Sequence, residues 1–212
     1  MEKHYMINQI SQHHNLHNYL EIGVRDTSNC FDKIVCQNKW SVDPGVEWHV
    51  NLATFPYESD VFFKKLERGH LSLPQDFEWD IVLIDGLHLA DQVYRDFVNS
   101  MNHLSDEGFI LFHDTNPPTI HHAREDYEDQ STPASYWWMG TCWKAIQKIR
   151  QVHRCSVFTM NDDWGVTVVR KKDALSMLNP DFNPFFEYNE FSRHRETVLN
   201  LGGDDDFLNW MK

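Results

Sequence analysis

The chain has 212 residues, of which 41% are hydrophobic and 24% charged, a composition typical of a globular protein. Its formal net charge of −13 would repel a phosphate backbone, so we expect no nucleic-acid partner. No window approaches the roughly 20 apolar residues that cross a bilayer, and the first 18 residues hold no apolar signal core. We therefore expect a cytoplasmic protein with no membrane partner.

The four cysteines are Cys30, Cys36, Cys142 and Cys155, and no two of them form a CxxC pair. This spacing supports neither a zinc knuckle nor a redox motif. We expect buried free thiols.

In the first third of the chain, apolar periodicity and breaker residues alternate between helical and strand patterns. Pro44 and Gly45 end a strand, and Gly69 lies where a glycine commonly ends a helix. The pattern predicts helices over 4–16, 28–37 and 58–69, and strands over 18–24, 39–45 and 70–73.

The middle of the chain carries the clearest strand signal, the unbroken apolar run 81–84 within the segment 79–88. Such a run is typical of a parallel strand that is buried on both faces. An amphipathic helix over 89–104 and a buried strand over 107–114 follow. The alternation of strands and helices predicts an α/β protein with right-handed crossovers.

Residues 115–139 break this rhythm, because they are polar, contain prolines and form too long a connection for an ordinary loop. Loops of this length are often lids or binding loops. Trp137, Trp138 and Trp143 beside it serve either as packing or as a stacking platform for a sugar or aromatic acceptor.

After this loop the pattern predicts a helix over 140–151 and an antiparallel edge pair of strands over 154–160 and 164–171. A further helix is predicted over 189–201. We expect one domain over residues 1–172 and an extension over residues 173–212, packed on the domain or on a partner subunit.

Acidic residues follow four of the predicted strands: Glu21, Asp43, Asp85 and Asp114. In an open α/β sheet, ligands bind outside the carboxyl ends of the strands. Asp43 lies 20 positions beyond Gly23 (43 − 23), the spacing at which an acid accepts hydrogen bonds from a ribose diol. Gly23 would let the backbone approach a ligand closely.

The first strand is not followed by a complete GxGxxG pattern. The sequence GVRDTSN would hold a pyrophosphate poorly, and Asp26 would repel one. An adenosine cofactor without phosphates fits better, which indicates S-adenosylmethionine (SAM), because its cationic sulfonium favours acidic surroundings.

Six segments between residues 18 and 171, in this order, resemble class I SAM-dependent methyltransferases. They are YLEIGV, SVDP, DIVLIDGLHLADQVYRDF, EGFILFHD, GTCWKAI and DWGVTVV. More narrowly, the chain resembles the group with IDGxH and HD motifs, methyltransferase family 24, which is related to macrocin-type sugar O-methyltransferases.

The resemblance implies a Rossmann-like, doubly wound, mostly parallel sheet of seven strands with an antiparallel C-terminal pair, followed by a helical extension. SAM would lie across the strand ends, with Glu21 and Gly23 near its methionine end and ribose. Asp43 would hold the ribose hydroxyls, and Asp85 would lie near the transferred methyl. Thr27 stands where relatives often carry a second glycine.

Two alternatives for activating the acceptor stay open. In related enzymes, acids at the positions of Asp85 and Asp114 bind a divalent ion, and oxygen ligands suit Mg²⁺. Those relatives usually supply a third oxygen ligand beside the second acid, where this chain has His113 and Thr115, with Asn116 one position further. In the metal-free alternative, His88 or His113 is the general base.

We therefore expect a SAM-dependent methyltransferase that acts on a hydroxyl of a sugar or another small acceptor, with a homo-oligomer as an open possibility. Two rival functions remain. One is a nicotinamide-dependent (NAD) oxidoreductase on a related fold. The other is a binding module that has the methyltransferase fold without its catalysis.

Overall fold

The computed structural model describes residues 1–47, 50–171 and 177–212. Within them, one sheet has the strand order β2-β1-β3-β4-β6-β5-β7. The strands are β1 (Asn18–Ile22), β2 (Asn38–Val42), β3 (Trp79–Ile84), β4 (Leu104–Phe112), β5 (Ser156–Met160), β6 (Val166–Arg170) and β7 (Leu201–Gly202).

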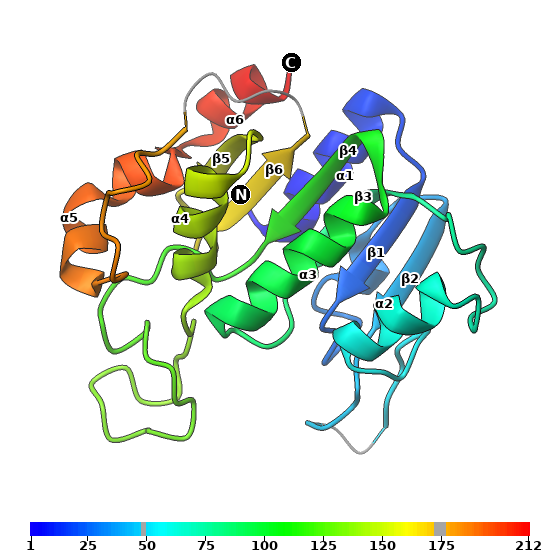
Figure 1. Cartoon of the computed structure of the whole chain (residues 1–212), viewed down its shortest axis with the longest axis horizontal. Helices are drawn as coiled ribbons and strands as arrows, with labels where there is room; N and C mark the ends of the chain where they lie inside the picture. The colour runs from blue at the N-terminus through cyan, green and yellow to red at the C-terminus, as the bar shows by residue number, and fades with distance from the viewer. Residues whose placement is uncertain (48–49, 172–176) are drawn as a thin grey trace.

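The described helices cover both faces of this sheet (Figure 1). They are α1 (Lys3–His14), α2 (Ser59–Glu67), α3 (Ala90–Asn102), α4 (Cys142–Val152), α5 (Tyr188–Leu199) and α6 (Asp204–Met211). The core clusters place α2, α3, α4 and α5 on one face and α1 and α6 on the other. The doubly wound α/β fold is confirmed.

Strands β2, β1, β3 and β4 are mutually parallel, and β6 runs antiparallel to both β4 and β5. The predicted parallel sheet with its antiparallel pair is therefore confirmed. Because parallel strands end at one edge, the residues that follow β1, β2, β3 and β4 share that edge. Strand β5 also ends there, since β6 reverses direction between it and β4.

Side chains alternate between the two faces of each strand, which divides the core. In β1, Leu20 and Ile22 pack toward α2 and α3, whereas Tyr19 packs toward α1. The same alternation puts Val82 and Ile84 of β3 on one face and Ile81 and Leu83 on the other, and all four are buried. Strand β3 is therefore buried on both sides, as its unbroken apolar run predicts.

The helix predicted over 28–37 is wrong, because only a single 3₁₀ turn, Phe31–Lys33, forms there. Beyond this turn, Ile34 and Cys36 are buried against the α1 side of the sheet while Val35 is 58% exposed, an extended pattern. Asn8 of α1 binds the backbone of this segment through Lys33 O and Val35 N. Helix α1 thus covers the face on which the predicted helix would have packed.

The strand predicted over 70–73 is also wrong, because this segment forms bends. Leu71 and Leu73 pack against the core on the α2 and α3 side, and the following Pro74 has no N–H for a ladder. The edge of β2 is instead covered by Phe55, which bridges Val42. The seventh strand is β7, which pairs with β5 at the opposite edge of the sheet.

The described part of the C-terminal segment adds to the same sheet and cores. Helix α5 packs on α4, while Phe207 and Met211 of α6 join the core on the α1 side. The predicted boundary between residues 172 and 173 lies outside the described residues, so the division into a domain and an extension stays a prediction. No described helix has both the length and the apolarity to cross a membrane.

Candidate active site at the strand ends

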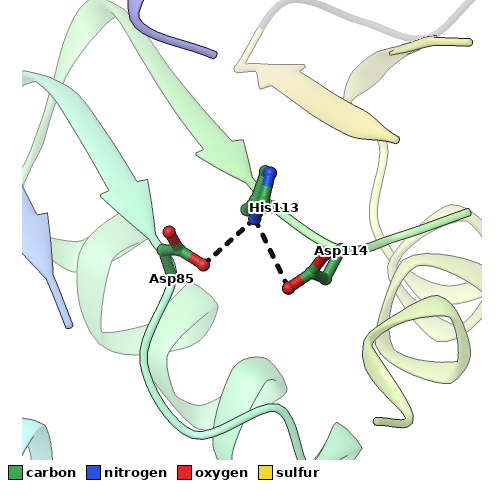
Figure 2. Close-up of side chains that lie close together, drawn as sticks. All are labelled: Asp85, His113 and Asp114. Carbon is green, nitrogen blue, oxygen red and sulfur yellow. Dashed lines mark ion pairs between the residues drawn. The ribbon is translucent and has the colours of Figure 1, made fainter. Parts of the chain in front are cut away.

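The structure brings Asp85, which follows β3, next to His113 and Asp114, which follow β4 (Figure 2). His113 lies between the two acids: its Nδ1 is 3.3 Å from Asp85 Oδ1 and 3.4 Å from Asp114 Oδ2. His88 closes the set on its other side, with Nε2 at 3.4 Å from Asp85 Oδ1 and Nδ1 at 3.3 Å from Asp114 Oδ2. The four side chains form a closed ring of alternating acids and imidazoles, which we call the catalytic ring after the role that we propose for it below.

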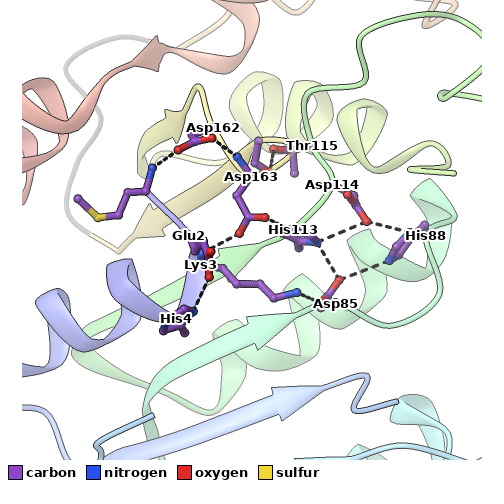
Figure 3. Close-up of polar contacts among 12 residues, drawn as sticks. Glu2, Lys3, His4, Asp85, His88, His113, Asp114, Thr115, Asp162 and Asp163 are labelled. Atoms are coloured by element: carbon purple, nitrogen blue, oxygen red, sulfur yellow. Dashed lines mark hydrogen bonds and ion pairs between the residues drawn. The ribbon is translucent and has the colours of Figure 1, made fainter. Parts of the chain in front are cut away.

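Two residues that the sequence analysis did not propose extend the ring (Figure 3). Lys3 Nζ lies 2.5 Å from Asp85 Oδ2, the oxygen that the histidines leave free. Asp163 Oδ1 lies 3.4 Å from His113 Nε2, and its Oδ2 accepts a hydrogen bond from Lys3 N at 2.8 Å. The charged side chains therefore come from the start of α1, the ends of β3 and β4, and the β5–β6 turn.

The placement of Lys3 and Asp163 had signals in the sequence. Helix α1 directly precedes β1 and returns along it. Its 12 residues span about 18 Å, close to the length of a five-residue strand, so its first turn reaches the carboxyl edge. Asp163 lies in the turn after β5, which ends at that edge once the antiparallel pair is in place.

The acids and the histidines of the ring stabilise each other's charged forms. Burial disfavours the imidazolium of His113, but the carboxylates of Asp85 and Asp114 outweigh it and hold its pKa well above the usual value. The pKa of His88 is likewise raised, against the cost of burial, by Asp85 and Asp114. Burial raises the pKa of Asp85, but the lowering by His113 and Lys3 is larger, so the pKa lies well below its usual range.

Backbone strain coincides with the ring. Asp114 has a φ of 59° and Asp163 a φ of 48°, and both are left-handed conformations that cost energy in a residue with a Cβ. These conformations aim the two carboxylates at the histidines. Strain of this kind collects at functional sites.

Gly23 and Asp43 have local structural roles in addition to the predicted ones. Gly23 has a φ of 92°, and a Cβ there would lie 2.3 Å from the carbonyl oxygen of Asp85. The glycine therefore lets the loops after β1 and β3 touch. Asp43 joins the loops after β1 and β2, because its oxygens accept hydrogen bonds from Val24 N at 2.8 Å and Gly45 N at 2.6 Å.

Glu21 is 3% exposed and faces the α1 side of the sheet, where it accepts a hydrogen bond from the Tyr19 hydroxyl at 2.5 Å. Burial is the main cause that raises the pKa of its carboxyl to about 7, with Asp85 adding to it and the Tyr19 hydroxyl and Lys3 opposing it. Glu21 therefore lies beside the catalytic ring as an acid that titrates near neutrality.

Glu21→Gln should stabilise the fold increasingly as the pH rises from about 5 to 8. The folded-state pKa of about 7 exceeds the ordinary 4.5, so the stability that the protonated acid supplies is present at low pH and is lost as the pH rises through 7. The difference corresponds to roughly 3 kcal/mol at pH 8. Urea unfolding across this range measures it. The exposed Asp26→Asn serves as control, and a Glu21→Gln gain that does not depend on pH would contradict the assignment.

The donor atoms of Asp85, His113 and Asp114 lie within 4.8 Å of one another, close enough to hold one metal ion. His88 Nδ1 and His113 Nε2 are buried without an aligned hydrogen-bond partner, so imidazole donors remain available. The residues that stand where relatives carry a third oxygen ligand are engaged elsewhere: Thr115 Oγ1 donates to Gly165 O, and Asn116 Oδ1 accepts from Arg195. Two carboxylates and an imidazole fit Mn²⁺, Fe²⁺ or Zn²⁺ better than the all-oxygen set that Mg²⁺ prefers.

The four cysteines are free and buried, as predicted. Of the candidate platform residues, Trp143 is buried and stacks on Phe191, with ring centroids 4.3 Å apart, so it belongs to the core. Trp138 stacks on His88 at 5.1 Å, and Trp137 is 48% exposed.

Comparison with known proteins gives a family match over part of the chain and a similar fold. Residues 18–115 match a family described as a methyltransferase domain, and no curated protein matches the chain. The SAH-bound methyltransferase PaMTH1 of Podospora anserina is 16% identical, with 80% of this chain and 77% of that chain covered and a TM-score of 0.52.

Two further solved structures are similar at lower TM-scores. The methyltransferase MycE of the mycinamycin biosynthetic pathway is 14% identical, with 80% and 49% of the two chains covered and a TM-score of 0.49. An O-methyltransferase from Bacillus cereus is 15% identical, with 78% and 79% covered and a TM-score of 0.45. The matched segment contains β1 to β4 and the catalytic ring, and the fold of the chain is similar to that of PaMTH1.

Proposed function

We propose that the chain transfers a methyl group from SAM to a hydroxyl of a small acceptor, such as a sugar. The observation that carries this proposal is the catalytic ring at the strand ends of a methyltransferase domain. The similar PaMTH1 holds SAH, the product that remains when SAM gives up its methyl group. Both facts support a methyl donor that lies across the ends of β1, β2 and β3.

The proposed roles follow the positions of the side chains. Asp43 accepts hydrogen bonds from the ribose hydroxyls, while Glu21 and Gly23 lie beside the methionine end. Asp85 lies near the methyl group, with its charge facing the sulfonium. These acids orient the donor, and orientation alone supplies much of the rate in a direct transfer.

The acceptor proton would pass to His113 or His88. As the acceptor oxygen forms its bond to the methyl carbon, the carbon–sulfur bond breaks and a neutral imidazole nitrogen takes the hydroxyl proton. Both histidines have a raised pKa, so the neutral form becomes abundant only as the pH rises. We therefore expect the rate to increase with pH above neutrality.

A divalent ion held by Asp85, His113 and Asp114, when bound, would lower the pKa of an acceptor hydroxyl. Lys3 and the ring protons compete with such an ion for the same donors. Transfer that continues in excess EDTA would assign the proton to the histidines alone.

The decisive experiment is calorimetric titration with SAH and, separately, with NAD, followed by incubation with methyl-tritiated SAM and a small-molecule extract. We expect saturable SAH binding and transfer of the label to a small hydroxylated compound. Binding of NAD without SAH would favour the oxidoreductase. Binding of SAH without transfer to any compound would favour the non-catalytic binding module, and either result would overturn the proposal.

Lys3→Met should raise the affinity for SAM relative to SAH by roughly tenfold. The ammonium of Lys3 neutralises Asp85 at 2.5 Å, and removing it strengthens the field on the cationic sulfonium of SAM more than on the neutral thioether of SAH. Calorimetry with both compounds measures the ratio. Lys33→Met, at an exposed lysine, has the same change in net charge and should leave the ratio unchanged. An unaltered ratio in Lys3→Met would place the sulfonium away from Asp85.

A further inference from the structure

The long connection between β4 and α4 is held in one conformation by Arg124. The guanidinium donates to four carbonyl oxygens, those of His121, Asp126, Ser135 and Trp137, at 2.7–3.0 Å. The indole N–H of Trp138 donates back to Arg124 O at 2.7 Å. The loop, which Figure 1 shows extending away from the sheet below α4, therefore presents its aromatic side chains from a braced backbone.

The end of this loop lies directly on the catalytic ring. The ring of Trp138 stacks on His88 with an interplanar angle of 19°. Gly140 has a φ of 61°, and a Cβ there would lie 2.0 Å from His88 O, so the backbones touch. Thr141 N donates to that same oxygen at 2.8 Å. The aromatic loop and the candidate general base thus form one unit.

A second aromatic residue reaches the same place from the β5–β6 turn. Gly165 N donates to Asp162 O at 2.9 Å, and the two residues between them, Asp163 and Trp164, have φ values of 48° and 61°. Positive φ at both central positions defines a type I′ turn, in which glycine or asparagine is preferred at the position of Trp164. A bulky indole at this position is strained, and no packing of the core requires it, since Trp164 is 39% exposed.

Trp164 joins the loop residues in an exposed aromatic surface, which we call the aromatic platform: His122, Trp137 and Trp164. The Trp137 and Trp164 rings are 5.3 Å apart, and His122 stacks on Trp164 at 5.9 Å. Trp137 and Trp164 remain 48% and 39% exposed. The platform adjoins the catalytic ring, because Asp163, the neighbour of Trp164, contacts His113.

The charges around the platform restrict what it can accept. The guanidinium of Arg124 donates its hydrogen bonds to backbone oxygens, and Lys144 is paired with Glu125 at 3.1 Å. The loop also carries Asp126, Glu128 and Asp129. An anionic group would therefore meet a negative field, whereas an uncharged or cationic ring would not.

We propose that His122, Trp137 and Trp164 form the acceptor subsite and bind a hydroxyl-bearing ring without negative charge by stacking, with its hydroxyl directed at the catalytic ring. This inference rests on the proposed function, since it defines the acceptor of that reaction. Aromatic faces stack on both phenolic and sugar rings. A phenolic acceptor and a sugar acceptor therefore share this stacking chemistry, and different probes distinguish them.

The test titrates SAH-saturated protein with each of three probes, and saturation-transfer NMR measures their binding. The probes are tyramine, its anionic analogue 3-(4-hydroxyphenyl)propionate, and methyl β-glucopyranoside. Tyramine or the glucoside should bind more tightly than the propionate, and whichever of the two binds identifies the source. Absence of binding by both, or tighter binding of the propionate, would overturn the proposal.

Trp164→Gly should weaken the binding of that probe by roughly tenfold, since it removes one stacking face while glycine suits the turn. Trp137→Ala, in a different segment, should weaken probe binding similarly. It shows whether the effect of Trp164→Gly comes from the lost stacking face and not from a folding defect. Phe185→Ala, at a side chain that is 85% exposed elsewhere, is the matched control and should bind normally. Unchanged probe affinity in both tryptophan variants would overturn the platform. The affinity for SAH should be the same in all variants. If the wild-type protein itself does not bind SAH, the proposed function fails, whatever the probes do.

Discussion

Asp85→Asn should lower the rate of methyl transfer by about 10²- to 10⁴-fold, the range for a proton-transfer step that loses its support. Asp85 holds three cationic groups at 2.5–3.4 Å: Lys3, His88 and His113. Asparagine keeps the size of the side chain but removes the charge that raises the pKa of His113. The acceptor found in the extract screen, followed with tritiated SAM in single turnovers, measures the effect.

Two further measurements separate a catalytic role of Asp85 from a structural one. The pH profile of Asp85→Asn should shift to lower pH, because the pKa of His113 falls when its carboxylate partner is neutral. The variant should also be destabilised, because Lys3, whose side chain is only 15% exposed, loses the carboxylate with which it pairs. Adding Lys3→Met should restore stability without restoring the rate. If the double variant regains both, Asp85 serves the fold alone.

Asp43→Ala should weaken SAH binding by roughly 1 to 3 kcal/mol, or about 5- to 150-fold, through loss of charge-assisted hydrogen bonds to the ribose. The carboxylate already accepts hydrogen bonds from Val24 N and Gly45 N. Those bonds fix the orientation of the carboxylate and leave further lone pairs for a ligand. Calorimetry measures the affinity, and thermal unfolding measures the accompanying loss of stability.

The matched control for Asp43→Ala is Asp26→Ala, an exposed acid in the neighbouring loop that caps a turn at Ser28. It changes the net charge equally and should bind SAH as tightly as the wild-type protein. A lower melting temperature with unchanged SAH affinity in Asp43→Ala would mean that Asp43 only clamps the two loops together.

The residues of the catalytic ring could be predicted from the sequence for a simple reason. Strands β3 and β4 are clear apolar runs, and parallel strands end at one edge, so Asp85, His113 and Asp114 were expected at that edge. The pairing of β3 with β4 brings them into contact. His88 follows within one turn of Asp85. The fold class was predictable from the same alternation of strands and helices.

The elements that the sequence pattern misplaced were decided by competition for the faces of the sheet. The segment 28–37 has a helical pattern, yet α1 covers the face it would have used, and Asn8 holds it extended. The segment 70–73 is apolar enough for a strand, yet it packs as bends against the α2 side. Local propensity is weak compared with burial in either case.

The sequence by itself determined the α/β fold with its parallel sheet, and the acids and histidines that follow β3 and β4, because apolar periodicity and the residues next to each strand are local features. Only the tertiary structure decided that Lys3 neutralises Asp85, that Asp163 contacts His113 and that Trp164 joins Trp137. Those contacts join parts of the chain 27 to 82 residues apart (164 − 137 and 85 − 3). Their geometry depends on how α1 and the antiparallel hairpin pack, which no local pattern encodes.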